Sequence, residues 1–337
     1  WSALDRKLDL LVANRQTLIF ELMGTPRGME GIDFADDDHL HAWKRLVRDL
    51  ARHYADRYGA ETLRSWWFET SNEPDLWHFW PHGLVKFLNY YDACSEGLLE
   101  ADPALRFGGP GTARGASDTF KLLMEHCAHG RNYFTGEKGV RIDFISTHRK
   151  NTPYEMIEDE LKVWRYVEHD FPQFRGLPIV NDEADPIAGW GIPYFWRTGP
   201  WYAAFVPQAI DLHNRFILDS IAMPYGILSN DNGFMGSWGK RTHLARFLPG
   251  DNDASTRGAS RRGGARVMEV AADDRPPVEQ FFLIKKPVLT VMSLLELLGE
   301  TRYPVSGPAD SLRPAMGTIA TRSEGGAFAL CVYHRPE

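Results

Sequence analysis

The 337-residue sequence lacks any run of 18 apolar residues. Its most apolar helix-like stretch, Val288 to Gly299, is interrupted by Glu296, which argues against a membrane span. The three cysteines, Cys94, Cys127 and Cys331, are too few and too scattered for a disulfide framework or a metal knuckle. The sequence also contains no Asn-x-Ser/Thr acceptor for N-glycosylation.

An excess of positive charge is also missing, since 38 Lys and Arg face 45 Asp and Glu, giving a net charge of −7. This balance argues against a general nucleic-acid-binding role, although a local basic pocket for one anionic group remains compatible with it. No His/Cys cluster has metal-ligand spacing and no Gly-rich loop would bind phosphate, so we predict neither a metal nor an organic cofactor. Compartment, source and oligomeric state are not encoded in these features.

What the sequence does contain is an alternation of short β-rich runs with longer amphipathic stretches, which is typical of parallel βαβ units. The candidate strands are 17–22, 65–69, 105–108, 141–146, 178–181 and 222–228. Between them, apolar residues recur at helical spacing in three stretches, 40–58, 84–98 and 157–171. We therefore expect an α/β fold in which helices cover a sheet.

The last third of the chain changes in texture. Residues 251–277 are rich in Gly, Arg, Asp and Ala without periodicity, which predicts a loop insertion, and a final helix with a kink at Pro287 follows. After Tyr303, short β-like pieces alternate with Gly and Ser, as at the start of a second, β-rich domain. We predict one α/β domain over residues 1–300 and the beginning of a β-sandwich over 301–337.

Two carboxylates stand where predicted strands end. The segment Asn72-Glu73-Pro74 follows one strand directly, and Asn181-Asp182-Glu183 follows another, with Pro186 closing the segment. Glutamates in such places suit a glycosidase, in which one carboxylic acid protonates the leaving oxygen while a second carboxylate attacks the anomeric carbon. Taken alone, Asn72-Glu73-Pro74 also fits a turn with a helix cap, and the segment around Asp182 and Glu183 also fits an acidic loop.

Longer segments resemble glycoside hydrolase family 39, and within it the branch that releases terminal α-L-iduronic acid from dermatan and heparan sulfate. The resembling segments cover nearly the whole chain: FELMG (20–24), FETSNEPD (68–75), FLNYYDACSEGL (87–98), PALRFGGPG (103–111), ISTHRK (145–150), NDEADP with Gly189-Trp190, LSNDN (228–232), RTHLARF (241–247) and KPVLT (286–290). The resemblance implies a (β/α)8 TIM barrel of which this chain holds strands three to eight. Strands one and two, and most of the C-terminal domains, would then lie outside it.

By the same resemblance, Glu73 ends strand four as the acid/base and Glu183 ends strand seven as the nucleophile, with Asn72 placed to bond the sugar 2-hydroxyl. A general acid must be protonated at the working pH, so we expect burial and the neighbouring Glu183 to raise the pKa of Glu73. Double displacement with retention further predicts carboxyl groups about 5 to 5.5 Å apart.

A uronic acid substrate requires groups that hold its carboxylate. Lys150 and Arg241 match family positions that supply such a contact, and so does the backbone N–H of Gly189. His148 and Asp231 also match pocket positions, and Trp190 could stack on a sugar ring. The alternatives without a role in substrate binding are surface charges for Lys150 and Arg241, a core histidine for His148 and a structural aromatic for Trp190.

The sequence departs from the family in two places. Ser71 stands where the family usually has Trp, and this smaller side chain would loosen the packing behind Glu73. The loop 233–240 looks shorter than its counterpart in the animal members of the family. We therefore predict a retaining exo-glycosidase that takes the uronic acid end of a glycosaminoglycan oligosaccharide, with no nucleic-acid or membrane partner. The alternatives are a β-xylosidase-like member of the same family and a non-catalytic carbohydrate-binding barrel.

Overall fold

The computed structural model describes residues 1–188, 192, 194–233, 242–247, 282–305 and 316–335. These residues form two compact units. The first contains Trp1–Ala188 and Gln208–Asp231, and the second contains the described residues of 189–207, 232–305 and 315–337. The domain boundary expected at residue 300 stays a prediction, and the loop expected over 251–277 lies outside the described residues.

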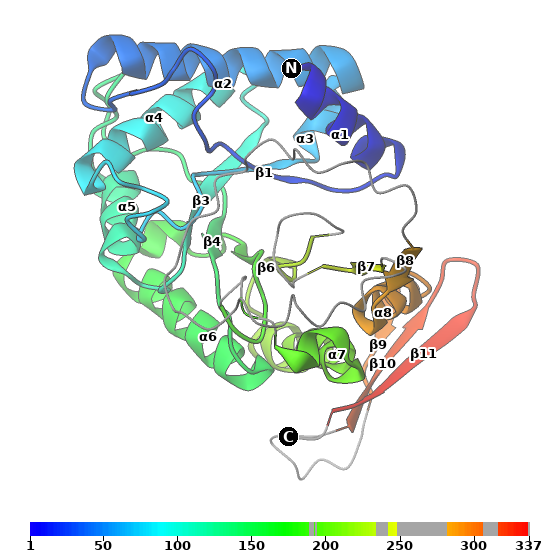
Figure 1. Cartoon of the computed structure of the whole chain (residues 1–337). Helices are drawn as coiled ribbons and strands as arrows, with labels where there is room; N and C mark the ends of the chain where they lie inside the picture. The colour runs from blue at the N-terminus through cyan, green and yellow to red at the C-terminus, as the bar shows by residue number, and fades with distance from the viewer. Residues whose placement is uncertain (189–191, 193, 234–241, 248–281, 306–315, 336–337) are drawn as a thin grey trace, which may run out of the picture. The chain divides into compact units, whose positions relative to one another are not determined.

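The first unit is built on six parallel strands that pair in chain order (Figure 1). They are β1 (Ile19–Glu21), β2 (Trp67–Glu69), β3 (Arg106–Thr112), β4 (Ile145–Thr147), β5 (Ile179–Asn181) and β6 (Tyr225–Leu228). All six predicted strands are confirmed, and together they form part of a (β/α)8 barrel. Their carboxyl ends meet at one edge, the place where such folds collect functional side chains.

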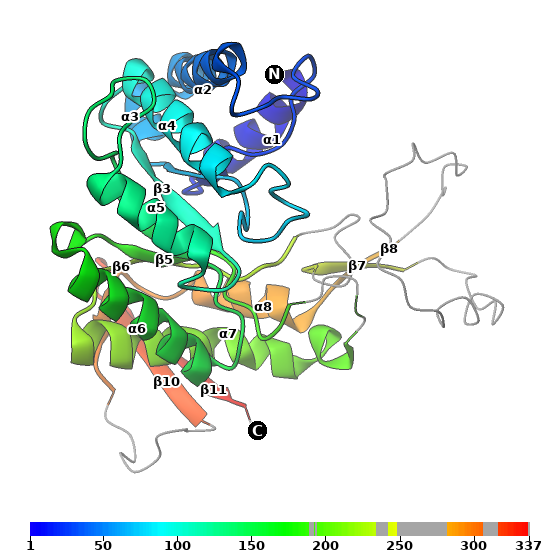
Figure 2. The ribbon, with the colours of Figure 1, turned by 90° about the vertical axis from the view of Figure 1, so that its left-hand side faces the viewer.

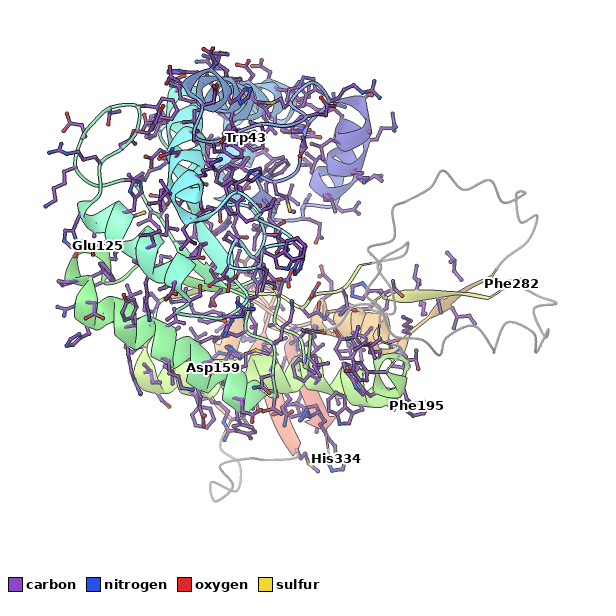
Figure 3. All side chains as sticks on the ribbon, turned by 60° about the vertical axis from the view of Figure 1, so that its left-hand side comes forward. Trp43, Glu125, Asp159, Phe195, Phe282 and His334 are labelled. Carbon is purple, nitrogen blue, oxygen red and sulfur yellow. The ribbon has the colours of Figure 1, made fainter. Side chains whose placement is uncertain are left out.

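Helices connect the strands and lie over the sheet, as Figure 2 shows for α4, α5 and α6. The three predicted amphipathic helices are confirmed as α2, α4 and α6. Figure 3 labels Glu125 on α5, where this side chain is exposed. The helices of this unit are α1 (Ser2–Ala13), α2 (Asp37–Tyr58), α3 (Ala60–Arg64), α4 (Leu84–Ala101), α5 (Asp118–His129), α6 (Pro153–Asp170) and a short 3₁₀ turn, η1 (Pro172–Phe174).

Local sequence explains why α2 forms and how it packs. Asp36 caps it, because its Oδ1 accepts a hydrogen bond from the backbone N–H of His39 at 3.0 Å. The apolar stripe of α2 is buried, and it faces α4 closely enough that a Cβ at Gly97 would lie 2.6 Å from the carbonyl oxygen of Lys44. A glycine at this position lets the two backbones approach.

The chain then enters an unusual helical segment. Helix α7 (Pro200–Leu212) runs into nine π-helical residues, η3 (His213–Ile221), which Ala222 ends in the left-handed conformation with φ of 56°. π-Helical turns are rare and frequently lie at functional sites. Gln208 to Ile221 belong to the first unit.

The second unit contains antiparallel strands. One sheet has the order β11-β10-β9, and β7 pairs with β8. Strands β10 and β11 lie after Tyr303, where the sequence predicts β-rich texture, whereas β7 and β8 were not predicted. Pro287 does not kink a helix as predicted; it begins α8, where its missing N–H is not needed. The elements are η2 (Phe195–Thr198), β7 (Leu244–Phe247), β8 (Phe282–Lys285), α8 (Pro287–Leu295), β9 (Thr301–Tyr303), β10 (Met316–Arg322) and β11 (Phe328–His334).

Among the described residues, none of the helices combines the length and the apolar character that crossing a bilayer requires.

Candidate active site

Glu73 lies just beyond β2 in a conformation that its own side chain disfavours. Its φ is 41°, in the left-handed region that non-glycine residues rarely adopt. The surrounding backbone holds it there, since its N–H donates to the carbonyl of Gly111 at 3.2 Å and its carbonyl accepts from the N–H of Leu76 at 2.9 Å. Strain kept in this way is typical of functional positions.

Glu183 follows β5 and is anchored through its neighbours. The N–H of Ala184 donates to the carbonyl of Ser229 at 2.7 Å, and the N–H of Ser229 donates back to the carbonyl of Asn181 at 2.9 Å. These two bonds tie the segment after β5 to the segment after β6. The side chain of Glu183 keeps 19% of its surface exposed, while that of Glu73 keeps 11%.

His148, just beyond β4, lies between the two glutamates. Its Nδ1 is 3.0 Å from Oε1 of Glu73 and 3.3 Å from Oε2 of Glu183, and its side chain is 1% exposed. One carboxylate oxygen of Glu73 and one of Glu183 lie within 4.8 Å of each other. The structure thus brings together the two glutamates that the sequence singled out.

Lys150 lies in the same cluster and contacts three carboxylates. Its Nζ donates to Oε2 of Glu183, and lies 3.2 Å from Oδ2 of Asp231 and 3.6 Å from Oε1 of Glu73. Lys150 is therefore not a solvated surface charge. His148 and Asp231 belong to the same cluster. All five residues lie in the first unit.

The charges in the cluster shift its pKa values. Burial lowers the pKa of His148, but the charge of Asp182 and the contacts with Asp182 and Glu73 outweigh it and hold that pKa well above its usual value. Burial likewise opposes the charge of Lys150, while Glu183, Asp231 and Glu73 raise its pKa. The carboxylates of the cluster therefore favour the charged form of both side chains.

The pKa of Glu73 is lowered, not raised as expected. Burial raises the pKa of Glu73, but the hydrogen bond with His148 and the charge of Lys150 together lower it by more. The expectation was wrong because it considered Glu183 and burial and missed two cations that pack against the same oxygen.

A second layer of carboxylates, which the sequence analysis missed, lies around His148. Asp182 Oδ1 is 3.4 Å from Nε2 of His148, and Ser146 donates its hydroxyl proton to Glu69, which is 1% exposed. Burial first, then the charge of Asp182, raises the pKa of Glu69 well above its usual value and that of Glu21 to about 8. Glu21 and Glu69 end β1 and β2, so the signal that identified Glu73 was available for them too.

Two sets of donor atoms are close enough to hold a metal ion, namely Glu21, His148 and Asp182, and Glu73, His148 and Glu183. Both sets use a ring nitrogen of His148, which must lose its proton to bind a metal ion, and the contacts with Asp182 and Glu73 favour the protonated ring. Lys150 also occupies an oxygen of Glu183. The donor chemistry therefore fits an ion-pair network better than a metal centre.

Of the remaining predicted residues, Asn72 and Asp231 lie within the described part of the chain. Asn72 is half-buried beside Glu73, and its Oδ1 has no hydrogen-bond partner within the described part of the chain. Asp231 is buried against Lys150. Gly189, Trp190, Arg241 and the loop over 233–240, apart from Gly233, lie outside the described residues.

Ser71 lines a cavity of about 150 Å³ beside the ends of β1 and β2. Aromatic side chains form much of its wall, including Phe34, Trp43, Trp80 and Tyr90. A small side chain at position 71 thus leaves space next to the segment that carries Glu73, in line with the looser packing expected there.

Comparisons with known proteins concern the family and the fold. Residues 1–333 match the model of glycosyl hydrolases family 39. The chain is 43% identical over 310 residues to the human α-L-iduronidase, an alignment that covers 88% of this chain and 44% of the human protein. It is 42% identical over 348 residues to the mouse α-L-iduronidase, covering 99% of this chain and 50% of that protein. The chain thus spans about half the length of these curated relatives.

Among solved structures, a bacterial orthologue of human α-L-iduronidase superposes with a TM-score of 0.84 at 37% identity, covering 100% of this chain and 54% of that one. A family 39 β-xylosidase from Caulobacter crescentus superposes with a TM-score of 0.62 at 19% identity, covering 96% and 62%. At that identity the second likeness concerns the fold alone.

Proposed function

Because the chain belongs to glycoside hydrolase family 39, we propose that it carries the site of a retaining exo-glycosidase that hydrolyses terminal α-L-iduronic acid linkages in glycosaminoglycans. The observation that carries the mechanism is the pairing of Glu73 with Glu183, whose nearest oxygens lie within 4.8 Å. This spacing suits double displacement, whereas an inverting pair leaves room for a water at about 6.5 to 9.5 Å.

In this mechanism Glu183 attacks the anomeric carbon while Glu73 protonates the leaving oxygen, and Glu73 then activates the water that hydrolyses the glycosyl-enzyme. His148 and Lys150 lower the pKa of Glu73 and so favour its ionised form in the free protein. When substrate engages the ammonium of Lys150, the charge that lowers the pKa of Glu73 is shared, and the acid form of Glu73 becomes easier to reach.

The substrate class rests on Lys150 and on the similarity to α-L-iduronidases of human and mouse. An ammonium in the cluster offers a charge-assisted contact to a uronate carboxylate. A β-xylosidase from Caldicellulosiruptor saccharolyticus is 37% identical over 203 residues, which cover 56% of this chain. A neutral pentoside is therefore the second candidate substrate, and it offers Lys150 no ionic partner.

The test is hydrolysis of a fluorogenic α-L-iduronide and a β-D-xyloside by the complete gene product, with Glu183→Gln as the nucleophile control. We expect iduronide turnover that the substitution abolishes, and a product that initially retains the anomeric configuration by NMR. Xyloside turnover alone would favour the second candidate. Binding of the iduronide without turnover would favour a carbohydrate-binding barrel.

Lys150→Met separates the two substrates further, because it keeps the length of the side chain and removes its charge. We expect kcat/KM to fall at least roughly ten-fold more for the iduronide than for the matched α-L-idoside, in which a hydroxymethyl group replaces the carboxylate. Equal losses on both glycosides would show that Lys150 serves the glutamates alone.

A further inference from the structure

A series of buried polar side chains that contact one another lies next to the proposed site and takes no part in the mechanism above. Glu160, on α6, is fully buried, and its Oε2 lies 3.0 Å from Nε2 of His213, the first residue of the π-helical segment. His213 is 4% exposed, and its Nδ1 lies 2.7 Å from the carbonyl oxygen of Ala209. A backbone carbonyl can only accept, so Nδ1 donates to Ala209, and Nε2 faces the carboxyl group of Glu160.

The surroundings favour the protonated form of His213. Burial lowers the pKa of His213, but the charge of Glu160 and the bonds to Glu160 and Ala209 raise it above its usual value. The ring of Tyr225 packs edge-on against His213 at 5.4 Å between centroids. A buried ion pair costs desolvation energy, so its presence calls for an explanation beyond stability.

Asn181 connects this pair to the site. Its Nδ2 donates to Oε1 of Glu160 at 2.7 Å and to the carbonyl of Arg149 at 3.1 Å, while its Oδ1 accepts from the N–H of Arg149 at 3.1 Å. The amide of Asn181 thus holds both backbone groups of Arg149, the residue before Lys150. Because Oε1 of Glu160 accepts from Nδ2 of Asn181, Glu160 also fixes which way the amide faces.

We propose that the Glu160–His213 pair is a positioning device that, through Asn181, fixes the segment carrying Lys150 and so sets the preference of the site for a charged over a neutral sugar. This inference rests on the proposed function and deepens it. Glu160 and His213 touch no reacting atom; they act through the orientation of one amide and the two hydrogen bonds that it makes to Arg149.

The test measures kcat/KM for an aryl α-L-iduronide and for the matched α-L-idoside in Glu160→Gln. A glutamine keeps the size of the side chain but removes its charge. We expect the iduronide-to-idoside ratio to fall roughly ten-fold. The matched control is Glu158→Gln, an exposed position on the same helix, which should leave the ratio unchanged.

A purely structural role would lower both rates together through loss of folded protein and would leave the ratio intact, which would overturn the proposal. Asn181→Ala provides the second variant, because it breaks the link to Arg149 and leaves the ion pair in place; it should lower the ratio as well. In the Lys150→Met background, Glu160→Gln should cause no further loss of ratio, since both act through the same ammonium.

Failure of the inference and failure of the proposed function give different results. Wild-type protein that hydrolyses no iduronide, or prefers the idoside, would refute the function itself. Wild-type protein that prefers the iduronide, together with Glu160→Gln and Asn181→Ala variants that keep this preference, would refute only the positioning role.

Discussion

Glu73 is held at a left-handed φ by backbone hydrogen bonds to Gly111 and Leu76. Its carboxylate faces the side chains of His148 and Lys150. The backbone strain and the lowered pKa lead to the same conclusion about Glu73. In the free protein this residue is kept ionised at a fixed position, so the proton it would donate must be taken up as the reaction begins.

The proposed acid/base role gives a prediction for Glu73→Gln. A glutamine cannot protonate a leaving group, so substrates with a poor leaving group, such as a sugar, should lose about 10²- to 10⁴-fold in rate. An aryl glycoside with an acidic phenol needs little protonation and should lose much less in the glycosylation step. The measurement is single-turnover kinetics with both substrates, and equal losses would contradict the assignment.

At the scale of elements, the packing of α4 on α2 depends on Gly97. Alanine is the better helix former by about 1 kcal/mol, so propensity alone predicts that Gly97→Ala stabilises α4. A Cβ there would lie 2.6 Å from the carbonyl oxygen of Lys44 and 3.0 Å from Cβ of Val47, and a backbone atom cannot move aside alone.

We therefore expect Gly97→Ala to lower the free energy of unfolding by about 1 to 3 kcal/mol, as overpacking typically does. Urea titration followed by circular dichroism would measure it. The matched control is Ser71→Ala, which adds no volume and lies beside a cavity instead of a backbone contact. A Gly97→Ala variant at least as stable as the wild type would contradict the close packing.

At the scale of the whole molecule, buried ionisable groups set how stability depends on pH. Glu21 has its pKa raised to about 8 by burial and by the charge of Asp182, so between about pH 4.5 and 8 the folded state binds more protons than the unfolded state. Stability falls as pH rises through that window. The raised pKa values of His148 and His213 act in the same direction, since their contribution is complete below pH 6.5 and is lost above it.

We expect the protein to be more stable near pH 5 than near pH 8, and Glu21→Gln to remove part of that difference. Glutamine resembles the protonated carboxyl, so the variant should match the wild type near pH 5 and exceed it near pH 8. Each unit of pKa difference corresponds to about 1.4 kcal/mol. Thermal unfolding at both pH values measures the effect, and a wild type with equal stability at both would refute it.

The sequence by itself determined the local features, because short-range periodicity and punctuation encode them. Six strands, three amphipathic helices and a glutamate placed after each of two strands were all predictable from apolar spacing and from Pro74 and Pro186. The family could also be predicted, from segments such as FETSNEPD and NDEADP, which the match over residues 1–333 confirms. The roles of the individual site residues stay predictions.

Only the tertiary structure decided which charges meet. The lowered pKa of Glu73 depends on His148 and Lys150, which lie 75 and 77 positions later in the chain and arrive through the pairing of strands. Glu69 and Glu160 look like ordinary acidic residues until folding buries them, and so does Glu21 until folding half-buries it beside Asp182. Electrostatic interactions depend on distance and burial in three dimensions, and spacing along the sequence fixes neither.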